Sequence, residues 1–160
     1  MDFKTLANQY RNELLDNVLP FWLEHSQDLE FGGYFTCLDR KGGVFDTDKF
    51  IWLQGREVWM FSMLYNKVEK RQEWLDCAVL GGEFLKKYGH NGDYNWYFSL
   101  NRSGRPLVEP YNIFSYTFAT MAFGQLSLAT GSQEYADIAK KTFEIILSKV
   151  DNPKGKWNKL

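Results

Sequence analysis

The sequence has little of the chemistry that marks several large classes of protein. Its 19 Lys and Arg residues nearly balance 20 Asp and Glu, and a net charge of −1 excludes a basic surface for nucleic acid or acidic membrane. No apolar run approaches membrane-spanning length. Of the two cysteines and two histidines, Cys37, Cys77, His25 and His90, none has the spacing of a metal or redox motif. We expect a cytoplasmic protein with reduced thiols and no bound metal.

Several catalytic patterns are also missing. The paired glycines lack the context of a phosphate-binding loop, and the serines lack that of a nucleophile elbow. No obvious buried pair of carboxylates appears, which argues against a glycoside hydrolase or lyase but leaves it as an alternative. What the sequence does have is aromatic residues, at 18% of the chain. They suit a core, and they also suit a cleft that stacks rings against sugar C–H surfaces.

Hydrophobic periodicity predicts five helical segments separated by aromatic turns. The first carries a stripe that runs through Leu6, Tyr10, Leu14, Val18 and Trp22, and Pro20 is expected to bend its last turns. The expected helices cover residues 3–25, 51–68, 73–88, 112–129 and 133–150, with Gly131 as a stop signal for the fourth. Short β-hairpins are expected around residues 32–43 and 96–106.

An internal repeat relates the two halves of this pattern at an offset of 62 residues. The shift places Tyr34-Phe35 on Trp96-Tyr97, Gly42 on Gly104 and Ile51 on Ile113. Matches therefore fall in the outer helix, the hairpin and the inner helix alike. Because one such unit cannot bury both faces of its inner helix, units must stack or close a ring. The chain holds about two and a half units, and we expect it to be cut from a longer array.

The sharpest local signal is Trp52-Leu53-Gln54-Gly55-Arg56, near the start of the second helix. A guanidinium on an apolar helix needs a partner. One interpretation pairs Arg56 with Glu57 or Asp48. The other aims Arg56 into a cavity, where it binds an anionic or developing oxyanion oxygen. The equivalent start of the fourth helix, at Ser115, is expected to face the same rim.

These motifs, taken together, resemble the N-acyl-D-glucosamine 2-epimerase (renin-binding protein) family. The resemblance rests on Gly32-Gly33-Tyr34-Phe35, on Trp-x-Gln-x-Arg ending at Arg56, on Ile113-Phe114-Ser115 and on residues 152–157. It implies an all-α (α/α)6 barrel, or toroid, of helical hairpins with short β-hairpins. We expect residues 1–160 to be the amino-terminal part of one such domain, with its first two to three units.

The resemblance implies interconversion of N-acetyl-D-glucosamine and N-acetyl-D-mannosamine by removal and return of the C2 proton. It makes Arg56 catalytic, and it places the family's two catalytic histidines beyond this chain. Inversion at one carbon needs a proton source on each face, so this chain alone is expected to be inactive. The residues expected to bind substrate are Tyr34, Trp52, Gln54, Phe114 and Ser115.

The remaining expectations concern ligands and alternatives. The resemblance requires no cofactor, is compatible with ATP or another nucleotide as an activator, and is compatible with a homodimer of the complete protein. The expected partner is an amino sugar. The alternative functions are a non-catalytic sugar-binding or interaction module that uses the same aromatic rim, and the (α/α)6 glycoside hydrolase or lyase.

Overall fold

The computed structural model describes residues 2–110 and 112–152, so the motif at 152–157 lies outside the described residues except for Asn152. No helix in this described part is both long and apolar enough to cross a membrane. The helices are α1 (Phe3–Glu13), the π-helical η1 (Leu14–Val18), α2 (Leu19–His25), α3 (Ile51–Lys67), α4 (Gln72–Tyr88), α5 (Phe114–Thr130) and α6 (Gln133–Ser148). The strands are β1 (Cys37–Leu38), β2 (Val44–Asp46), β3 (Lys49–Phe50), β4 (Ser99–Leu100) and β5 (Pro106–Val108).

The four later helices begin and end within two residues of the predicted bounds. α5 stops as expected at Gly131, which adopts a left-handed φ of 72° and donates its N–H to the Ser127 carbonyl. α6 begins immediately afterwards, because the Ser132 side chain accepts a hydrogen bond from the Tyr135 N–H. These local signals explain why two long helices can follow each other with so short a turn.

The two predicted hairpins have the same internal geometry, which confirms the repeat. β1 pairs with β2 and β4 with β5, both antiparallel and each with an irregularity in its register. In the first turn Asp39 exchanges backbone hydrogen bonds with Gly42 and Gly43, and in the second Asn101 does so with Gly104 and Arg105. Gly42 and Gly104 have φ values of 83° and 90°. The match extends well beyond a shared turn sequence.

A third strand connects the two units, and the sequence pattern did not reveal it. β3 pairs antiparallel with β4, so the second hairpin becomes a three-stranded sheet in the order β3-β4-β5. The Ile51 N–H then donates to the Phe98 carbonyl. This bond satisfies one of the free N–H groups at the start of α3, where Phe50 offers no side-chain cap.

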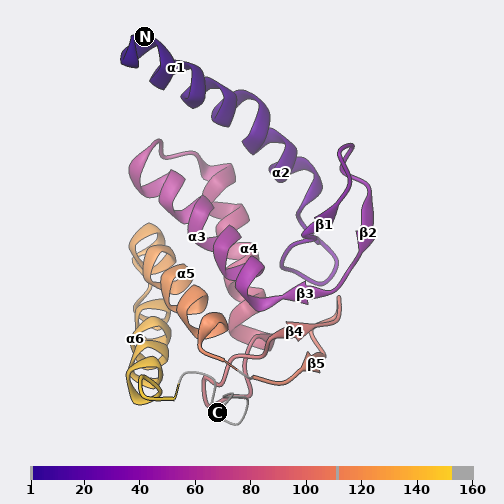
Figure 1. Cartoon of the computed structure of the whole chain (residues 1–160), viewed down its shortest axis with the longest axis vertical. Helices are drawn as coiled ribbons and strands as arrows, with labels where there is room; N and C mark the ends of the chain where they lie inside the picture. Colours follow the sequence, from indigo (N-terminus) through magenta and orange to yellow (C-terminus); the bar gives the residue numbers. More distant parts are fainter. Residues whose placement is uncertain (1, 111, 153–160) are drawn as a thin grey trace.

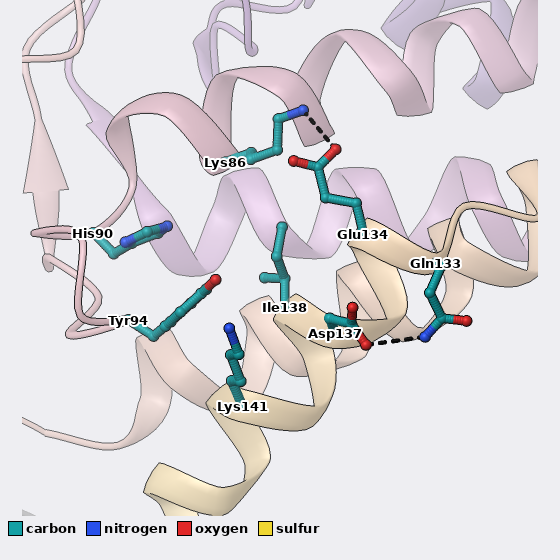
Figure 2. Close-up of a pocket in the computed structure, with 8 residues that line it drawn as sticks. All are labelled: Lys86, His90, Tyr94, Gln133, Glu134, Asp137, Ile138 and Lys141. Atoms are coloured by element: carbon teal, nitrogen blue, oxygen red, sulfur yellow. Dashed lines mark hydrogen bonds and ion pairs between the residues drawn. The ribbon is translucent and has the colours of Figure 1, made fainter.

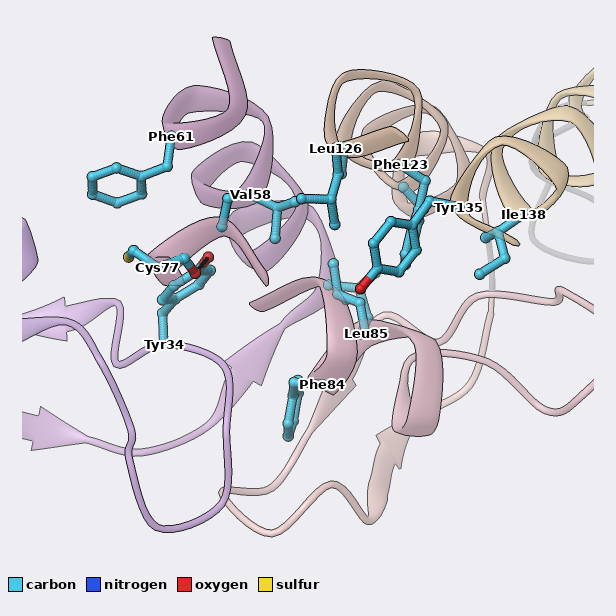
Figure 3. Packing of buried hydrophobic residues seen from close by; sticks show 14 of the residues in the cluster. Tyr34, Val58, Phe61, Cys77, Phe84, Leu85, Phe123, Leu126, Tyr135 and Ile138 are labelled. Carbon is cyan, nitrogen blue, oxygen red and sulfur yellow. Dashed lines mark hydrogen bonds between the residues drawn. The ribbon is translucent and has the colours of Figure 1, made fainter. Parts of the chain in front are cut away.

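The core lies where the helices of both units pack together (Figure 1). α3 packs along α5, while α4 packs on α3 and α6 packs on α5. Figure 3 shows Tyr34 reaching from the loop before β1 toward Cys77 of α4, while Phe123 of α5 and Tyr135 of α6 lie close together. Gly81 lies directly against the Tyr34 ring, so a side chain there would collide with it. The absence of a side chain at Gly81 thus makes room for the Tyr34 ring on α4.

The first predicted helix differs from expectation in two ways. It is interrupted by η1, in which the Leu19 N–H bonds to Leu14, one residue wider than an α-helical turn. Pro20 follows immediately, and its ring would clash with the carbonyl four residues before it in a regular helix. The middle of the predicted stripe is also exposed, since Tyr10 is 69% and Val18 40% exposed, whereas Trp22 at its end packs against the core. α1 lies at the margin of the helical array (Figure 1).

Candidate active site

Arg56 lies in the second turn of α3 with no internal counter-ion. No carboxylate among residues 2–110 and 112–152 comes within ion-pair distance of it, so the pairing with Glu57 or Asp48 does not form. Its guanidinium instead lies 5.8 Å from the ring centres of both Trp52 and Phe118, on α3 and α5. Aromatic faces attract a cation without neutralising it. The charge of Arg56 therefore remains available to a ligand.

A cavity of about 310 Å³ opens beside Arg56. This volume falls at the lower end of those found for small-molecule sites. The lining positions on α3 recur at helical spacing and form one face, while α2 and the loop before β1 supply the opposite wall. The lining residues are Trp22, Thr36, Leu53, Arg56, Glu57, Trp59 and Met60. Arg56 thus lines a cleft, as its sequence context predicted.

Two polar side chains of this cavity, Glu57 and Thr36, differ from ordinary buried groups, the first in its pKa and the second in its hydrogen bonding. Glu57 is 7% exposed, and burial raises the pKa of its carboxyl to about 8. It is therefore mostly an uncharged acid at neutral pH, hydrogen-bonded to Ser26 at 2.5 Å. The Thr36 hydroxyl is buried and has no hydrogen-bond partner in the described structure. An unsatisfied buried hydroxyl is unfavourable, which is consistent with a site built for a polar ligand.

This combination suits an uncharged polyhydroxy ligand with a reactive carbonyl. The indole rings of Trp22 and Trp59 offer apolar surface for C–H groups, while Thr36 offers a hydrogen-bonding hydroxyl. The Arg56 guanidinium presents planar donors that can stabilise negative charge as it develops on an oxygen. Of the residues that line the cavity, only Glu57 has a pKa near neutrality, so the cavity can bind and polarise a sugar but lacks a second proton-transferring group.

Tyr34 and Gln54 lie in the core rather than on the cavity wall. The Tyr34 hydroxyl donates to the Cys77 carbonyl at 2.7 Å, and Gln54 exchanges two hydrogen bonds with the Tyr34 backbone. Both side chains are fully buried. Because their polar atoms are already satisfied, we correct their expected role: they hold the loop before β1 against α3 and are not positioned as sugar contacts.

The other expected contacts also lie outside the lining of this cavity. Trp52 is half-buried beside the guanidinium, and Ser115 is buried at the start of α5. Phe114 is 64% exposed. Their roles in substrate binding stay predictions. Sequence reasoning missed Trp22, Thr36, Leu53, Glu57, Trp59 and Met60, although helical spacing from Arg56 would have found Leu53 and Met60 on the same face.

A second cavity, of about 460 Å³, lies on the other side of the array between α4 and α6 (Figure 2). Its Lys86 is already paired with Glu134, at 3.2 Å. His90 stacks on Tyr94 at 4.8 Å, and burial lowers the pKa of this histidine. None of the predicted site residues lines this cavity, and neither His25 nor His90 lines the cavity of Arg56. The candidate active site is therefore the cavity around Arg56.

Comparison with known proteins identifies the family to which the chain is similar. The family model for N-acylglucosamine 2-epimerase (GlcNAc 2-epimerase) matches residues 33–159. The N-acylglucosamine 2-epimerase of Bos taurus is 44% identical over 146 residues, which are 88% of this chain and 35% of that protein. The human N-acylglucosamine 2-epimerase is 44% identical over 137 residues, covering 83% of this chain and 32% of that protein.

A solved structure supports the same assignment at the level of the fold. Cellobiose 2-epimerase from Bacillus thermoamylovorans superposes with a TM-score of 0.82 at 29% identity, over 91% of this chain and 38% of that one. Cellobiose 2-epimerases are (α/α)6 barrels, so the predicted fold class is confirmed and these residues fold as part of such a barrel. The chain spans about a third of the length of the curated relatives it matches.

Proposed function

This chain belongs to the N-acylglucosamine 2-epimerase family, and we propose that it forms the amino-terminal, Arg56-bearing part of a sugar 2-epimerase barrel. The proposed reaction interconverts N-acetyl-D-glucosamine and N-acetyl-D-mannosamine through removal and return of the C2 proton. The observation that carries the proposal is the unpaired guanidinium of Arg56 beside a cavity with two tryptophans and polar groups. N-acyl sugars are preferred to cellobiose here because the 44% identical relatives are N-acylglucosamine 2-epimerases.

Arg56 acts on the carbonyl oxygen of the open-chain sugar. Loss of the C2 proton moves electron density onto that oxygen and gives an enediolate-like intermediate. A fixed guanidinium next to the oxygen stabilises this charge more in the transition state than in the ground state. Trp22 and Trp59 hold the carbon chain and exclude water. Arg56 therefore makes C2 more acidic without itself transferring the proton.

The proton-transferring groups come, in this proposal, from other parts of the barrel. Inversion requires one group on each face of C2, and neutral imidazoles suit that task near pH 7. Neither His25 nor His90 lines the cavity of Arg56.

A nucleotide such as ATP as activator, a homodimer of the complete protein and a cytoplasmic location remain part of this proposal. The two free cysteines, Cys37 and Cys77, support a reducing compartment.

The experiment measures sugar conversion and deuterium incorporation at C2, in a protein that carries this chain within a complete barrel. N-acetylmannosamine is incubated with it in deuterated water, and cellobiose and mannose are tested in parallel. We expect N-acetylglucosamine that carries one deuterium at C2. Conversion of cellobiose but not N-acetylmannosamine would contradict the substrate assignment, and conversion without deuterium at C2 would contradict the proton-transfer chemistry.

A further inference from the structure

The hydroxyl of Ser26, at the end of α2, lies between two oxygen atoms that normally accept hydrogen bonds. Its Oγ is 2.6 Å from the Trp22 carbonyl oxygen and 2.5 Å from Oε1 of Glu57. A serine hydroxyl has a single proton to donate, and a carbonyl oxygen can only accept. If Ser26 donates to Trp22, the contact with Glu57 is bonding only when the carboxyl carries a proton and donates it to Ser26.

The surroundings of Glu57 favour the same protonated state. The side chain is almost fully buried, and an ionised carboxylate there would be very unfavourable without a cation. The titratable groups that interact with it from neighbouring elements are Tyr34, before β1, and Cys77, on α4; burial raises the pKa of both, so both are neutral. Arg56 is the only cationic residue among those that line the cavity.

Glu57 and Arg56 are consecutive residues of α3, so their side chains leave the helix in different directions, but both line the same cavity. We propose that Glu57 is a positioning residue whose proton, held by Ser26, keeps the Arg56 guanidinium free of an internal counter-ion. When Glu57 ionises at alkaline pH, the new carboxylate attracts Arg56 away from the sugar oxygen. The effect of Glu57 ionisation on catalysis rests on the proposed epimerase function, whereas the protonation state of Glu57 does not.

The first test needs only this chain. NMR follows the Glu57 carboxyl carbon and the Arg56 Nε signal as pH is raised, in the wild type and in the isosteric, uncharged Glu57→Gln. Glu24→Gln, which removes an exposed carboxylate from α2, is the matched control. We expect the carboxyl to titrate well above pH 7, and the Arg56 signal to follow it in the wild type and in Glu24→Gln but not in Glu57→Gln. A carboxyl that titrates near its ordinary pKa of about 4.3, or an Arg56 signal indifferent to Glu57, overturns the proposal.

Ser26→Ala tests the direction of the hydrogen bond, also in case Glu57→Gln does not fold. If Glu57 donates to Ser26, removing the hydroxyl destabilises the protonated acid and lowers its pKa. A higher pKa would mean that Ser26 donates to a carboxylate, contrary to the proposal.

In the complete barrel, turnover of N-acetylmannosamine should lose about tenfold per pH unit once Glu57 ionises, and Glu57→Gln should remove this alkaline limb. An identical limb in Glu57→Gln contradicts the proposal, whereas no turnover at any pH contradicts only the epimerase function.

Discussion

Lys49, the first residue of β3, connects the two repeats through a completely buried ammonium group. Its Nζ donates to Asp28 at 2.9 Å and to the carbonyls of Gly32 and Arg102, one from each unit. Although burial by itself raises the pKa of Asp28, the hydrogen bonds from Arg102 and Lys49 outweigh it and lower that pKa. Asp28 is therefore ionised at neutral pH and forms a compensated buried pair.

Replacing Lys49 by Met should destabilise the fold strongly. The substitution leaves three acceptors without their shared donor, and breaking a buried pair typically costs about 3–5 kcal/mol of unfolding free energy. Arg71→Met is the control, because its ion pair with Glu69 is surface-exposed and worth about 1 kcal/mol or less. Urea denaturation at neutral pH measures both. Equal losses in the two variants would contradict a structural role for the buried ammonium.

The sequence located Arg56 correctly but misjudged the residues around it. The Trp-x-Gln-x-Arg motif singled out an arginine near the start of an apolar helix, and Arg56 is exposed there and lines a cavity. Spacing does not reveal which polar residues are already satisfied by contacts distant in sequence. Gln54 is hydrogen-bonded to Tyr34, 20 residues away, and Glu57 to Ser26, 31 residues away. Both partnerships depend on how loops return to α3.

At the scale of elements, each hairpin turn is packed against the end of the helix that precedes it. Gly42 lies over the ring of His25, which ends α2, and Gly104 lies over the ring of Tyr88, which ends α4. Both glycines have a positive φ. The turn therefore requires glycine for its backbone and also for the absence of a side chain. The outer helix and the hairpin are thus positioned together in each unit.

Gly104→Ala should be more destabilising than Gly131→Ala. Both positions have a positive φ, for which an alanine costs about 1–2 kcal/mol. A β-carbon at Gly104 would also lie 2.5 Å from the Tyr88 ring, whereas at Gly131 it meets open space. Thermal or urea denaturation of the two variants gives the difference. Similar stability losses would show that the ring yields easily and that the turn is not packed as described.

Elements with strong local signals were predictable, and those that depend on distant contacts were not. α3 to α6 follow from periodicity and from stop signals such as Gly131. The hairpin turns follow from Asp39 and Asn101, whose side chains accept backbone hydrogen bonds from Gly43 and Arg105. β3 has only two residues, and its pairing with β4 depends on how the two units approach each other. The widened turn of η1 likewise reflects the clash at Pro20, which predicted a bend but not its form.

At the scale of the whole molecule, binding and proton transfer are assigned to different parts of the barrel. This chain supplies Arg56 and the cavity beside it. His25 packs on Phe21 at 4.9 Å near the first hairpin, and His90 lines the separate cavity between α4 and α6. Neither imidazole can flank C2 of a sugar held by Arg56. In the proposed function, the chain supplies one part of the binding face and lacks a complete set of bases.

The 160-residue chain alone should therefore catalyse no exchange at C2. N-acetylmannosamine incubated with the purified chain in deuterated water should keep its C2 proton at the background rate, as followed by proton NMR. His25→Gln and His90→Gln would be examined if exchange occurred. Deuterium incorporation that either substitution abolished would mean that one of these imidazoles reaches the substrate, and the division between binding and proton transfer would be wrong.

The most direct test of the account is the contribution of Arg56 to the rate of proton removal in the complete barrel. Deuterium incorporation at C2 of N-acetylmannosamine is measured for the wild type, Arg56→Ala and Arg56→Lys, with Arg40→Ala, an exposed arginine of the first hairpin turn, as the control. Loss of one oxyanion-stabilising donor typically lowers kcat about 10²–10³-fold, and lysine should not restore it fully because it lacks the planar fork. We predict that loss for Arg56→Ala, partial recovery for Arg56→Lys and a wild-type rate for Arg40→Ala. A wild-type rate in Arg56→Ala would contradict the account.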